Sequence, residues 1–558
     1  MAGKKPLRSM AVMNEIRRAH WKVLGIKDED LTKPKIAVVN SSSELAICFS
    51  HLDGIAKVVK SAIWAAGGIP FEVRTAAPSD FLIGAANAGG YILPSRDLVV
   101  NDMEIAIEGA QLDGMICLSS CDKTPPAHLM AAGRFNIPTI LVICGYQPSG
   151  EYKGEHVGIE DLFLGGVQTA FGKLSKDELH GMAEQAIQGP GVCSGMATAN
   201  SMHSLCEALG MTLPGAAPIL ANSPRMFELA RRSGERIVEM VLEDLKPRDI
   251  MTADSFHNAI ATLLAISGSI NCIKHMQATA IETGVDVDIY QMVNDLGRKV
   301  PVLSAVQPNG DVLIDEFAHA GGARAMLKQL QPLLKTNALT VTGRTLGDNL
   351  KDVVVKDEEI IRPLSRPYST EAPIVILKGS LAPESAVIKL GIRDASRKTK
   401  FRGPAIVFDS GQEAIKAIQD GKIKRGDALV VRGMGLKGGP GMGGPASQVV
   451  FALDSAGMQS DVAFVSDGQL SGLCNKGLTI AETSPEAAVG GPLSLVENGD
   501  TIIIDVDNHQ LDLDVPADVL ARRREAKGEI KLPKSSGYLS IYQRAVQDMH
   551  TGAVLVEK

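Results

Sequence analysis

The chain has 558 residues, of which 45% are hydrophobic, 22% are charged and 4% are aromatic, and its formal net charge is −7. These values are typical of a globular protein with a large core, and the length suggests roughly two to four domains. The absence of a basic tail or basic patch, together with the low aromatic content, argues against nucleic acid as a partner.

The N-terminal sequence and the cysteine usage both indicate a cytoplasmic protein. The segment MAGKKPLRSMAVMNEIRRAHW lacks the continuous apolar run of a secretory signal, and apolar runs elsewhere, such as IPTILVICG, are too short to span a bilayer. Eight cysteines are too few for a disulfide scaffold in a chain of this length. We therefore expect no membrane association, and thiols that stay reduced and free to bind metal.

The first part of the chain alternates short β-branched runs with amphipathic helical patterns. Strands are predicted at residues 35–41, 68–75, 112–119 and 137–145, and a helix is predicted over 51–66. This alternation predicts an α/β domain with a parallel sheet, in which ligands bind at the carboxyl ends of the strands. Cys48, Asp80 and Cys121 each follow a predicted strand, so we expect them to lie at that edge of the sheet.

The pattern changes along the second part of the chain. Residues 200–345 are mostly helical by pattern, and the segment 356–373 is charged and holds three prolines, as a linker would. Beyond it, short apolar runs separated by Gly, Asp and Asn predict a β-rich barrel or sandwich. We therefore expect an N-terminal α/β domain over residues 1–360 and a C-terminal β-rich domain over 361–558.

Three cysteines lie in stretches rich in small and polar residues: Cys48 in SSSELAICFSH, Cys121 in CLSSCDKTPPA and Cys193 in GPGVCSGMATANSM. Three scattered thiolates can hold an iron–sulfur cluster that leaves one iron open as a Lewis acid. A cysteine is more often a small buried hydrophobe, and local sequence leaves the two interpretations evenly balanced for these three. The core interpretation is preferred for the cysteines in apolar strands or helices, Cys117, Cys144, Cys206 and Cys272, while Cys474 is ambiguous.

Charged residues near these cysteines allow both a structural and a metal-binding interpretation. Asp122 and Lys123 follow a predicted buried strand and precede Pro125 and Pro126, which suggests a rigid loop. Asp122 could bind a hard cation such as Mg²⁺ with Lys123 as a counter-charge, although such pairs are usually solvated. Asp80 could be a second oxygen ligand, but on its own sequence a helix N-cap is favoured.

Two glycine-rich segments lie in the C-terminal half. GMGLKGGPGMGGPAS, residues 433–447, matches neither the Walker spacing nor GxGxxG between a strand and a helix, so an active-site loop is as plausible as a phosphate-binding loop. SDGQLSG, residues 466–472, places Ser471 in a turn after a predicted strand. A serine in such a turn is most often structural. The alternative is that Ser471 acts as a catalytic base in its alkoxide form, which requires a strong cation nearby to lower the pKa of the hydroxyl.

Taken together, these segments resemble the dihydroxy-acid dehydratase/phosphogluconate dehydratase family, which also contains aldonate (sugar-acid) dehydratases. The resemblance extends over nearly the whole chain and rests on motifs in the same order: SELAICFSHL, PSDFL, CDKTPPAHLMA, GVCSGMATANSM, NAIATLLAISGSIN, LKGSLAPESAVIK, KGGPGM, SDGQLSG and SPEAAVGGPL. It implies an N-terminal α/β domain, a C-terminal β-barrel-like domain, an active site between them and a homodimer.

The resemblance also implies roles for individual residues. By position, the ligands of a [2Fe–2S] cluster are Cys48, Cys121 and Cys193, and the presence of Cys48 favours that branch over the [4Fe–4S] branch. The Mg²⁺ ligands are Asp80, Asp122 and a carbamylated Lys123, and the catalytic base is Ser471. The implied reaction removes water from a 2,3-dihydroxy acid to give a 2-keto acid, with Lewis-acid assistance to the hydroxyl that leaves.

The chain departs from the family's pattern near the metal site. The family usually has a glutamate ligand for Mg²⁺ where this chain has Gly444, and often has a histidine where this chain has Glu482. We hypothesise that Glu482 or a water replaces the missing carboxylate. The sequence AICF around Cys48 also differs from the family's usual PCN.

The substrate motifs are mixed. GVCSGMATANSM resembles the branched-chain dihydroxy-acid enzymes, whereas SEL before Cys48 and CDKTPPA resemble sugar-acid dehydratases. We expect a hydro-lyase for branched-chain acids of the 2,3-dihydroxyisovalerate type, with relaxed specificity that extends to short acids such as glycerate. The alternatives are an aldonate dehydratase and a non-catalytic iron–sulfur sensor that has lost the metal site through Gly444.

Overall fold

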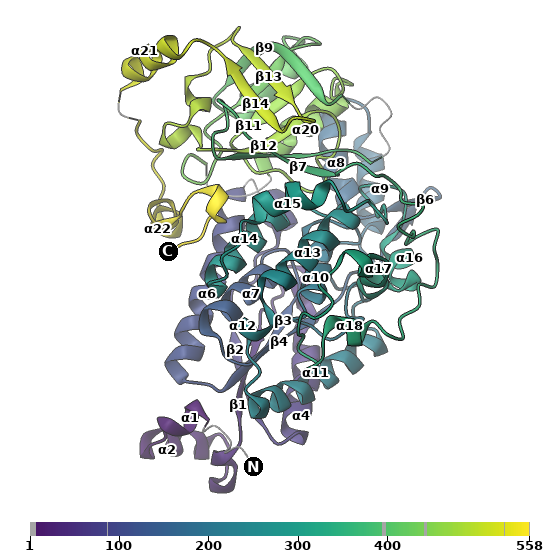
Figure 1. The fold of residues 1–558 in the computed structure, drawn as a ribbon, viewed down its shortest axis with the longest axis vertical. Helices are drawn as coiled ribbons and strands as arrows, with labels where there is room; N and C mark the ends of the chain where they lie inside the picture. Colours follow the sequence, from purple (N-terminus) through teal and green to yellow (C-terminus); the bar gives the residue numbers. More distant parts are fainter. Residues whose placement is uncertain (1–6, 86–87, 393–397, 440–443, 529, 557–558) are drawn as a thin grey trace.

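The computed structural model describes the whole chain except residues 1–6, 86–87, 393–397, 440–443, 529 and 557–558. Figure 1 shows two regions stacked along the long axis of the molecule, a helical N-terminal region around a small sheet and a β-rich C-terminal region above it. The predicted fold class, a parallel-sheet α/β domain followed by a β-barrel-like domain, is confirmed.

The N-terminal sheet is parallel and has the strand order β2–β1–β3–β4. Its strands fall within the four predicted runs: β1 (Lys35–Asn40), β2 (Ile69–Arg74), β3 (Gly114–Ser119) and β4 (Thr139–Ile143). Every residue of β1, β3 and β4 is buried, as expected for parallel strands that are covered on both faces. The crossover helix α4 (Leu52–Ala65) follows β1 and buries Ile55, Val59 and Ile63.

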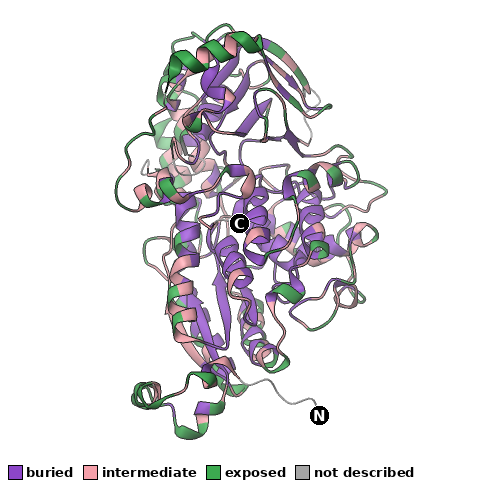
Figure 2. Ribbon diagram, turned by 60° about the vertical axis from the view of Figure 1, so that its left-hand side comes forward, coloured by how far each residue is buried: buried purple, intermediate pink, exposed green. Residues whose placement is uncertain are grey.

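Apart from a hairpin of β5 (Gly150–Tyr152) and β6 (Glu155–Val157), the other elements of the N-terminal region are helices. The longer ones are α2 (Glu15–Val23), α6 (Ile92–Met103), α7 (Thr124–Phe135), α8 (Ile159–Ala170), α9 (Lys176–Gln185), α10 (Thr198–Ala208), α11 (Pro224–Glu243), α13 (Ala253–Ala265), α14 (Asn271–Thr283), α15 (Ile289–Gly297) and α17 (Gly322–Leu330). Every residue of α10 is buried, and α13 and α14 are buried over most of their lengths, so these three helices form the centre of the region (Figure 2). The helical pattern predicted for residues 200–345 is confirmed.

The C-terminal region contains a mixed sheet of eight strands in the order β14–β13–β9–β10–β11–β12–β8–β7. The strands are β7 (Ile374–Leu377), β8 (Ser385–Lys389), β9 (Lys400–Phe408), β10 (Ala428–Val431), β11 (Ala463–Ser466), β12 (Thr479–Ser484), β13 (Thr501–Asp505) and β14 (Gln510–Asp514). The edges meet, because the Lys378 amide donates to the His509 carbonyl at 2.9 Å and the Leu511 amide donates to the Lys378 carbonyl at 3.0 Å. The sheet is therefore a nearly closed barrel rather than a sandwich.

The final segment of the chain returns to the N-terminal region. It contains α22 (Gly537–Ala545) and the short 3-10 helix η7 (Met549–Thr551), and Tyr542 of α22 shares an apolar cluster with Ile92 and Leu93 of α6. The Tyr290 hydroxyl donates to the main chain of η7 at 2.9 Å, and Arg96 donates to the Ala553 carbonyl at 2.7 Å. These contacts join the final segment to α6 and α15, two helices that lie much earlier in the sequence.

Residues 356–373, the predicted linker, form no helix or strand, and the predicted domain boundary at residue 360 lies within this segment. Outside the masked positions, none of the helices combines the length and the apolar character that crossing a membrane requires.

Candidate active site

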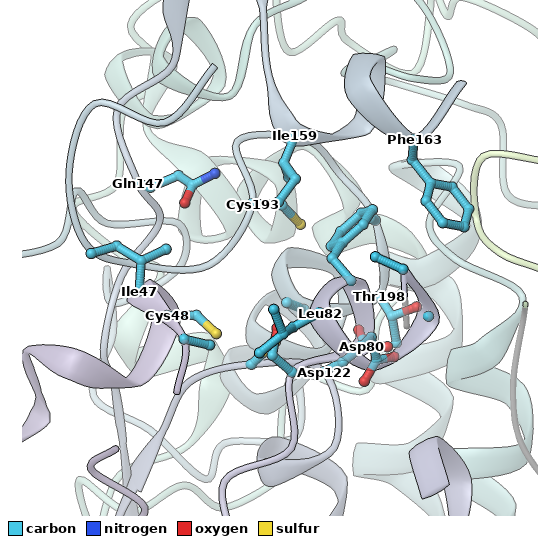
Figure 3. A pocket seen from close by; sticks show the side chains of 18 of the residues that line it. Ile47, Cys48, Asp80, Leu82, Asp122, Gln147, Ile159, Phe163, Cys193 and Thr198 are labelled. Atoms are coloured by element: carbon cyan, nitrogen blue, oxygen red, sulfur yellow. The ribbon is translucent and has the colours of Figure 1, made fainter. Parts of the chain in front are cut away.

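Residues from both regions meet around a cavity of about 520 Å³ (Figure 3). The predicted site residues that line it are Cys48, Asp80, Cys121, Asp122, Cys193 and Ser471. The first three follow β1, β2 and β3, so the carboxyl edge of the parallel sheet faces the cavity as expected. Ser471, which follows β11, comes from the C-terminal region. The structure thus brings six of the eight predicted residues together, while Lys123 and Glu482 do not line the cavity.

The three candidate cluster cysteines reach the cavity from different elements. Cys48 lies in the short helix α3 (Ile47–Ser50), next to the fully buried Phe49. Cys121 occupies the turn between β3 and α7, and Cys193 lies in an irregular segment before α10. In Figure 3 the sulfur atoms of Cys48 and Cys193 point into the cavity.

These thiols influence one another electrostatically. A hydrogen bond with Cys48, and after it burial, raises the pKa of Cys121. Burial, followed by the charges of Glu160 and Cys121, raises the pKa of Cys193. Thiols in this arrangement are costly to ionise together, and a bound metal relieves that cost because it replaces their protons with positive charge. The three side chains therefore fit a shared metal group.

The three thiols border the cavity from separate segments of the chain, as the ligands of an iron–sulfur cluster would. Among the described residues, only Glu384, Asp548 and His550 bring three ligand atoms close enough together to share a single ion, and they lie outside this cavity. The other five cysteines are buried, which confirms the core prediction for Cys117, Cys144, Cys206 and Cys272.

Asp80, Asp122 and Lys123 form a buried charge cluster beside the cavity. Lys123 is fully buried and donates to Asp122 Oδ2 at 2.7 Å and to Asp80 Oδ2 at 3.2 Å. Burial raises the pKa of Asp80, and the charge of Asp122 raises it further. Burial acts in the same direction on Asp122, but the positive charge of Lys123 and several hydrogen bonds outweigh it, so the pKa of Asp122 lies below its usual value.

The local structure around these residues confirms one interpretation and corrects another. Asp122 and Lys123 lie in the turn between β3 and α7, as expected, and Pro125 and Pro126 follow in the first turn of α7, where a missing amide hydrogen costs nothing. Asp80 is the first residue of α5 (Asp80–Ala85), and its Oδ1 has no hydrogen-bond partner among the described residues. The carboxylate faces Lys123 and does not cap the helix, so the N-cap interpretation is wrong. A buried acceptor without a donor fits a bound cation.

A series of polar contacts connects this cluster to Glu482. The Thr198 hydroxyl bonds to Asp122 and accepts a hydrogen bond of 3.0 Å from the Asn271 side chain. The Asn271 oxygen accepts a hydrogen bond of 2.8 Å from Lys274, which is ion-paired with Glu482 in a fully buried position. Because Glu482 already neutralises a buried lysine, its role as a replacement metal ligand stays a prediction that must compete with this ion pair.

Ser471 lies in a turn that is fixed by two hydrogen bonds. Its backbone amide donates to the Ser447 hydroxyl at 2.9 Å, and its own hydroxyl oxygen accepts from the Leu473 amide at 3.3 Å. Ser447 belongs to α20 (Gly444–Ser455), the helix that begins at the position of the missing family glutamate. The contact with Leu473 uses a lone pair of the Ser471 oxygen, and within the described part of the chain no acceptor binds its hydroxyl hydrogen.

The glycine-rich segment 433–447 connects β10 to α20, and residues 440–443 of it lie outside the described part of the chain. Two carboxylates that sequence reasoning missed, the buried Asp467 and the half-buried Glu486, hold its first half. Asp467 accepts from two backbone amides of the segment at 3.1 and 2.9 Å, and Glu486 accepts from the Lys437 amide at 2.7 Å. These backbone amides already donate to carboxylates of the protein, so they are not available to bind a phosphate.

Protonation of Glu486 makes the contribution of this carboxylate to stability depend on pH. Burial, and after it the charge of Asp467, raises the pKa of Glu486 from 4.5 to about 7. Because the folded-state pKa lies above the unfolded value, stability is highest at low pH and falls as the pH rises through about 7. In the parent protein we expect the free energy of unfolding, measured with urea, to fall by on the order of 3 kcal/mol between about pH 5 and about pH 8. In Glu486→Gln we expect this fall to be absent. Equal pH slopes for the variant and the parent protein would contradict this assignment.

Comparisons with known proteins agree with this architecture. Residues 33–349 match the family described as "Dihydroxy-acid/6-phosphogluconate dehydratase N-terminal", and residues 359–553 match "Dihydroxy-acid/6-phosphogluconate dehydratase C-terminal". Two curated proteins named dihydroxy-acid dehydratase, from Caldicellulosiruptor saccharolyticus and Caldicellulosiruptor bescii, are each 39% identical to the chain over 541 residues. Each alignment covers 97% of this chain and 97% of the relative.

Proposed function

The chain belongs to the dihydroxy-acid/6-phosphogluconate dehydratase family and is a dehydratase of dihydroxy acids, and we propose that its substrates include branched-chain acids of the 2,3-dihydroxyisovalerate type, in preference to aldonates. Loss of water from such an acid gives a branched-chain 2-keto acid. The observation that carries this choice of substrate is the apolar wall of the cavity that holds the predicted site residues.

The wall of the cavity is mainly aliphatic and aromatic. Large apolar side chains that line it are Ile47, Leu82, Ile92, Ile159, Leu162 and Phe163. No lysine or arginine is among the described residues that line it, so a substrate phosphate would meet no charged donor there. A sugar acid carries a hydroxyl on nearly every carbon, and hydroxyls buried against this wall without partners would weaken binding. A branched alkyl group gains free energy from the same burial.

We propose that a [2Fe–2S] cluster and a Mg²⁺ ion bind at the polar side of the cavity. The cluster ligands are Cys48, Cys121 and Cys193, and the Mg²⁺ ligands are Asp80, Asp122 and a carbamylated Lys123. The three thiols around one cavity and the unpartnered Asp80 oxygen support this assignment. Carbamylation would replace an ammonium that now neutralises both carboxylates with an oxygen ligand. When bound, the two groups supply Lewis-acid assistance to the departure of the C3 hydroxyl.

The side chains of the protein itself control the protons of the reaction. We propose that Ser471, in its alkoxide form, takes the C2 proton and becomes the neutral hydroxyl. Its oxygen shares the cavity with the candidate metal ligands, whose bound cation would stabilise the alkoxide, and its turn is fixed by Ser447. Thr198 and Asn271 also line the cavity and hold the Asp122 carboxylate in place. The apolar wall limits the access of water, so the proton passes to the serine rather than to solvent.

The proposed Mg²⁺ site predicts a specific loss in one variant. We expect Asp80→Asn to raise the Mg²⁺ concentration for half-maximal activity by at least about tenfold, because a ligand becomes neutral. The measurement is a Mg²⁺ titration of the rate after removal of bound divalent ions. Glu482→Gln in the same titration tests the replacement-ligand hypothesis: a comparable shift supports Glu482 as a ligand, and unchanged Mg²⁺ dependence rejects it.

Anaerobic assays with added Mg²⁺ on a panel of acids test the proposed function. We expect turnover of 2,3-dihydroxyisovalerate to exceed that of aldonates and glycerate. Turnover of aldonates alone would contradict the branched-chain assignment, and no turnover of any member would favour the iron–sulfur sensor. We also propose, from family membership, that the enzyme is a cytoplasmic homodimer.

A further inference from the structure

The cavity is larger than a five-carbon dihydroxy acid requires. Its volume of about 520 Å³ lies in the range of pockets that enclose drug-sized ligands. The charged groups lie at one side: Figure 3 shows Asp80, Asp122 and Thr198 close together, with Ile159 and Phe163 across the cavity from them and Gln147 apart from them, near Ile47. The remaining space is therefore bordered mainly by apolar side chains.

The apolar wall continues outward beyond the reacting groups. Around the opening, Leu45, Leu82, Ile47 and Ile187 keep 74, 51, 40 and 36% of their surface exposed, although all four line the cavity. Large apolar side chains that are both exposed and contiguous with a pocket commonly mark a binding surface. These four residues are called the apolar rim below.

The far side of the wall is rigid. Phe163 of α8 makes edge-on contacts with Phe81 of α5 and with Phe451 of α20, with ring centroids 5.7 Å apart in both pairs. The three rings come from both regions of the molecule and hold α8 in place opposite the candidate metal ligands. A preformed apolar surface of this kind binds a hydrocarbon chain without a large cost of ordering the protein.

We propose that the cavity accepts 2,3-dihydroxy acids whose C3 substituent is a long or bulky hydrocarbon chain, and that the apolar rim binds the end of that chain. The proposal rests on the proposed function, since the carboxylate and the two hydroxyls must lie at the polar side of the cavity. The chain would then extend past Ile159 and Phe163 toward the rim. The occupant of the rim is therefore part of the substrate, because the rim and the polar side belong to one continuous cavity.

The test is a series of 2,3-dihydroxy acids that differ only in the length of the alkyl chain, from a methyl to a hexyl substituent at C3, assayed with the intact holoenzyme. We expect kcat/KM to rise by about two- to fourfold for each added CH2 group, since burial of one CH2 corresponds to about fourfold at most. In Ile187→Ser and Leu82→Ser, we expect this rise to flatten for the longer acids. The matched control is Ile105→Ser, at an apolar residue that is 79% exposed and does not line the cavity.

The outcomes separate this inference from the proposed function. Turnover of the shorter acids with kcat/KM falling at each added CH2 overturns the inference and leaves the proposed function intact. No turnover of any acid overturns both. A rim covered by a second copy of the chain would also overturn the inference: Ile187→Ser would then change the sedimentation of the protein and leave the chain-length profile as in the parent.

Discussion

Replacement of Ser471 by alanine is expected to lower kcat for 2,3-dihydroxyisovalerate by at least about a thousandfold, because a positioned general base contributes roughly a hundred- to ten-thousandfold to a rate. The serine lines the cavity beside the candidate metal ligands, and no other predicted site residue of the C-terminal region lines it. The variant should keep the parent's iron content, since Ser471 is not among the proposed metal ligands. Steady-state rates and iron content per chain measure the two properties separately.

Ser447→Ala provides a graded control for this result. Ser447 accepts the hydrogen bond of the Ser471 amide and does not line the cavity, so its loss should loosen the turn without removing the reacting oxygen. We expect a decrease of about tenfold in kcat, the order expected for a small misplacement of a catalytic group. If Ser471→Ala instead stays within about tenfold of the parent enzyme, the base must be another group.

Replacement of Cys193 by alanine is expected to abolish the bound cluster and to lower activity by at least about a thousandfold, because the Lewis acid would be lost. The thiol of Cys193 points into the cavity, and burial together with the charges of Glu160 and Cys121 raises its pKa. Its removal takes away one of three candidate ligands. Iron and sulfide content and the visible absorption spectrum report the loss of the cluster independently of activity.

Cys206→Ala is the matched control for the cysteine variant. Cys206 lies in α10, fully buried, and does not line the cavity. Its truncation should cost about 1 kcal/mol of stability as a small core deletion and leave iron content unchanged. Equal iron content in Cys193→Ala and in the parent would refute the ligand assignment of Cys193.

The fold was predictable where local pattern and burial agree. The strands β1, β3 and β4 are continuous apolar runs because the parallel sheet is covered on both faces, and such runs are visible in the sequence. The strands β8 (SAVIK) and β12 (TIAETS) mix polar and apolar residues, and nothing local distinguishes them from turns. Their burial comes from neighbours in the barrel, so only tertiary structure reveals them.

The candidate site was predictable in part for the same reason. Cys48, Asp80 and Cys121 follow strands of one parallel sheet, so their meeting at one edge follows from topology. The contact of Asn271 with Thr198 joins positions 73 residues apart, and no spacing rule connects them. The two carboxylates that brace the glycine-rich segment escaped prediction likewise, because their partners are backbone amides, which carry no signature in the sequence.

The return of the C-terminal segment to the N-terminal region has a consequence for biosynthesis. Helix α22 packs against α6, and Ile92 of α6 lines the cavity. During translation the first domain emerges early and begins to fold, yet α6 receives this packing partner only after the whole barrel has been synthesised. The cavity is thus completed late, so a nascent chain holds the three candidate cluster thiols in an unfinished pocket, and the proposed cluster would find its complete site only after α22 has emerged.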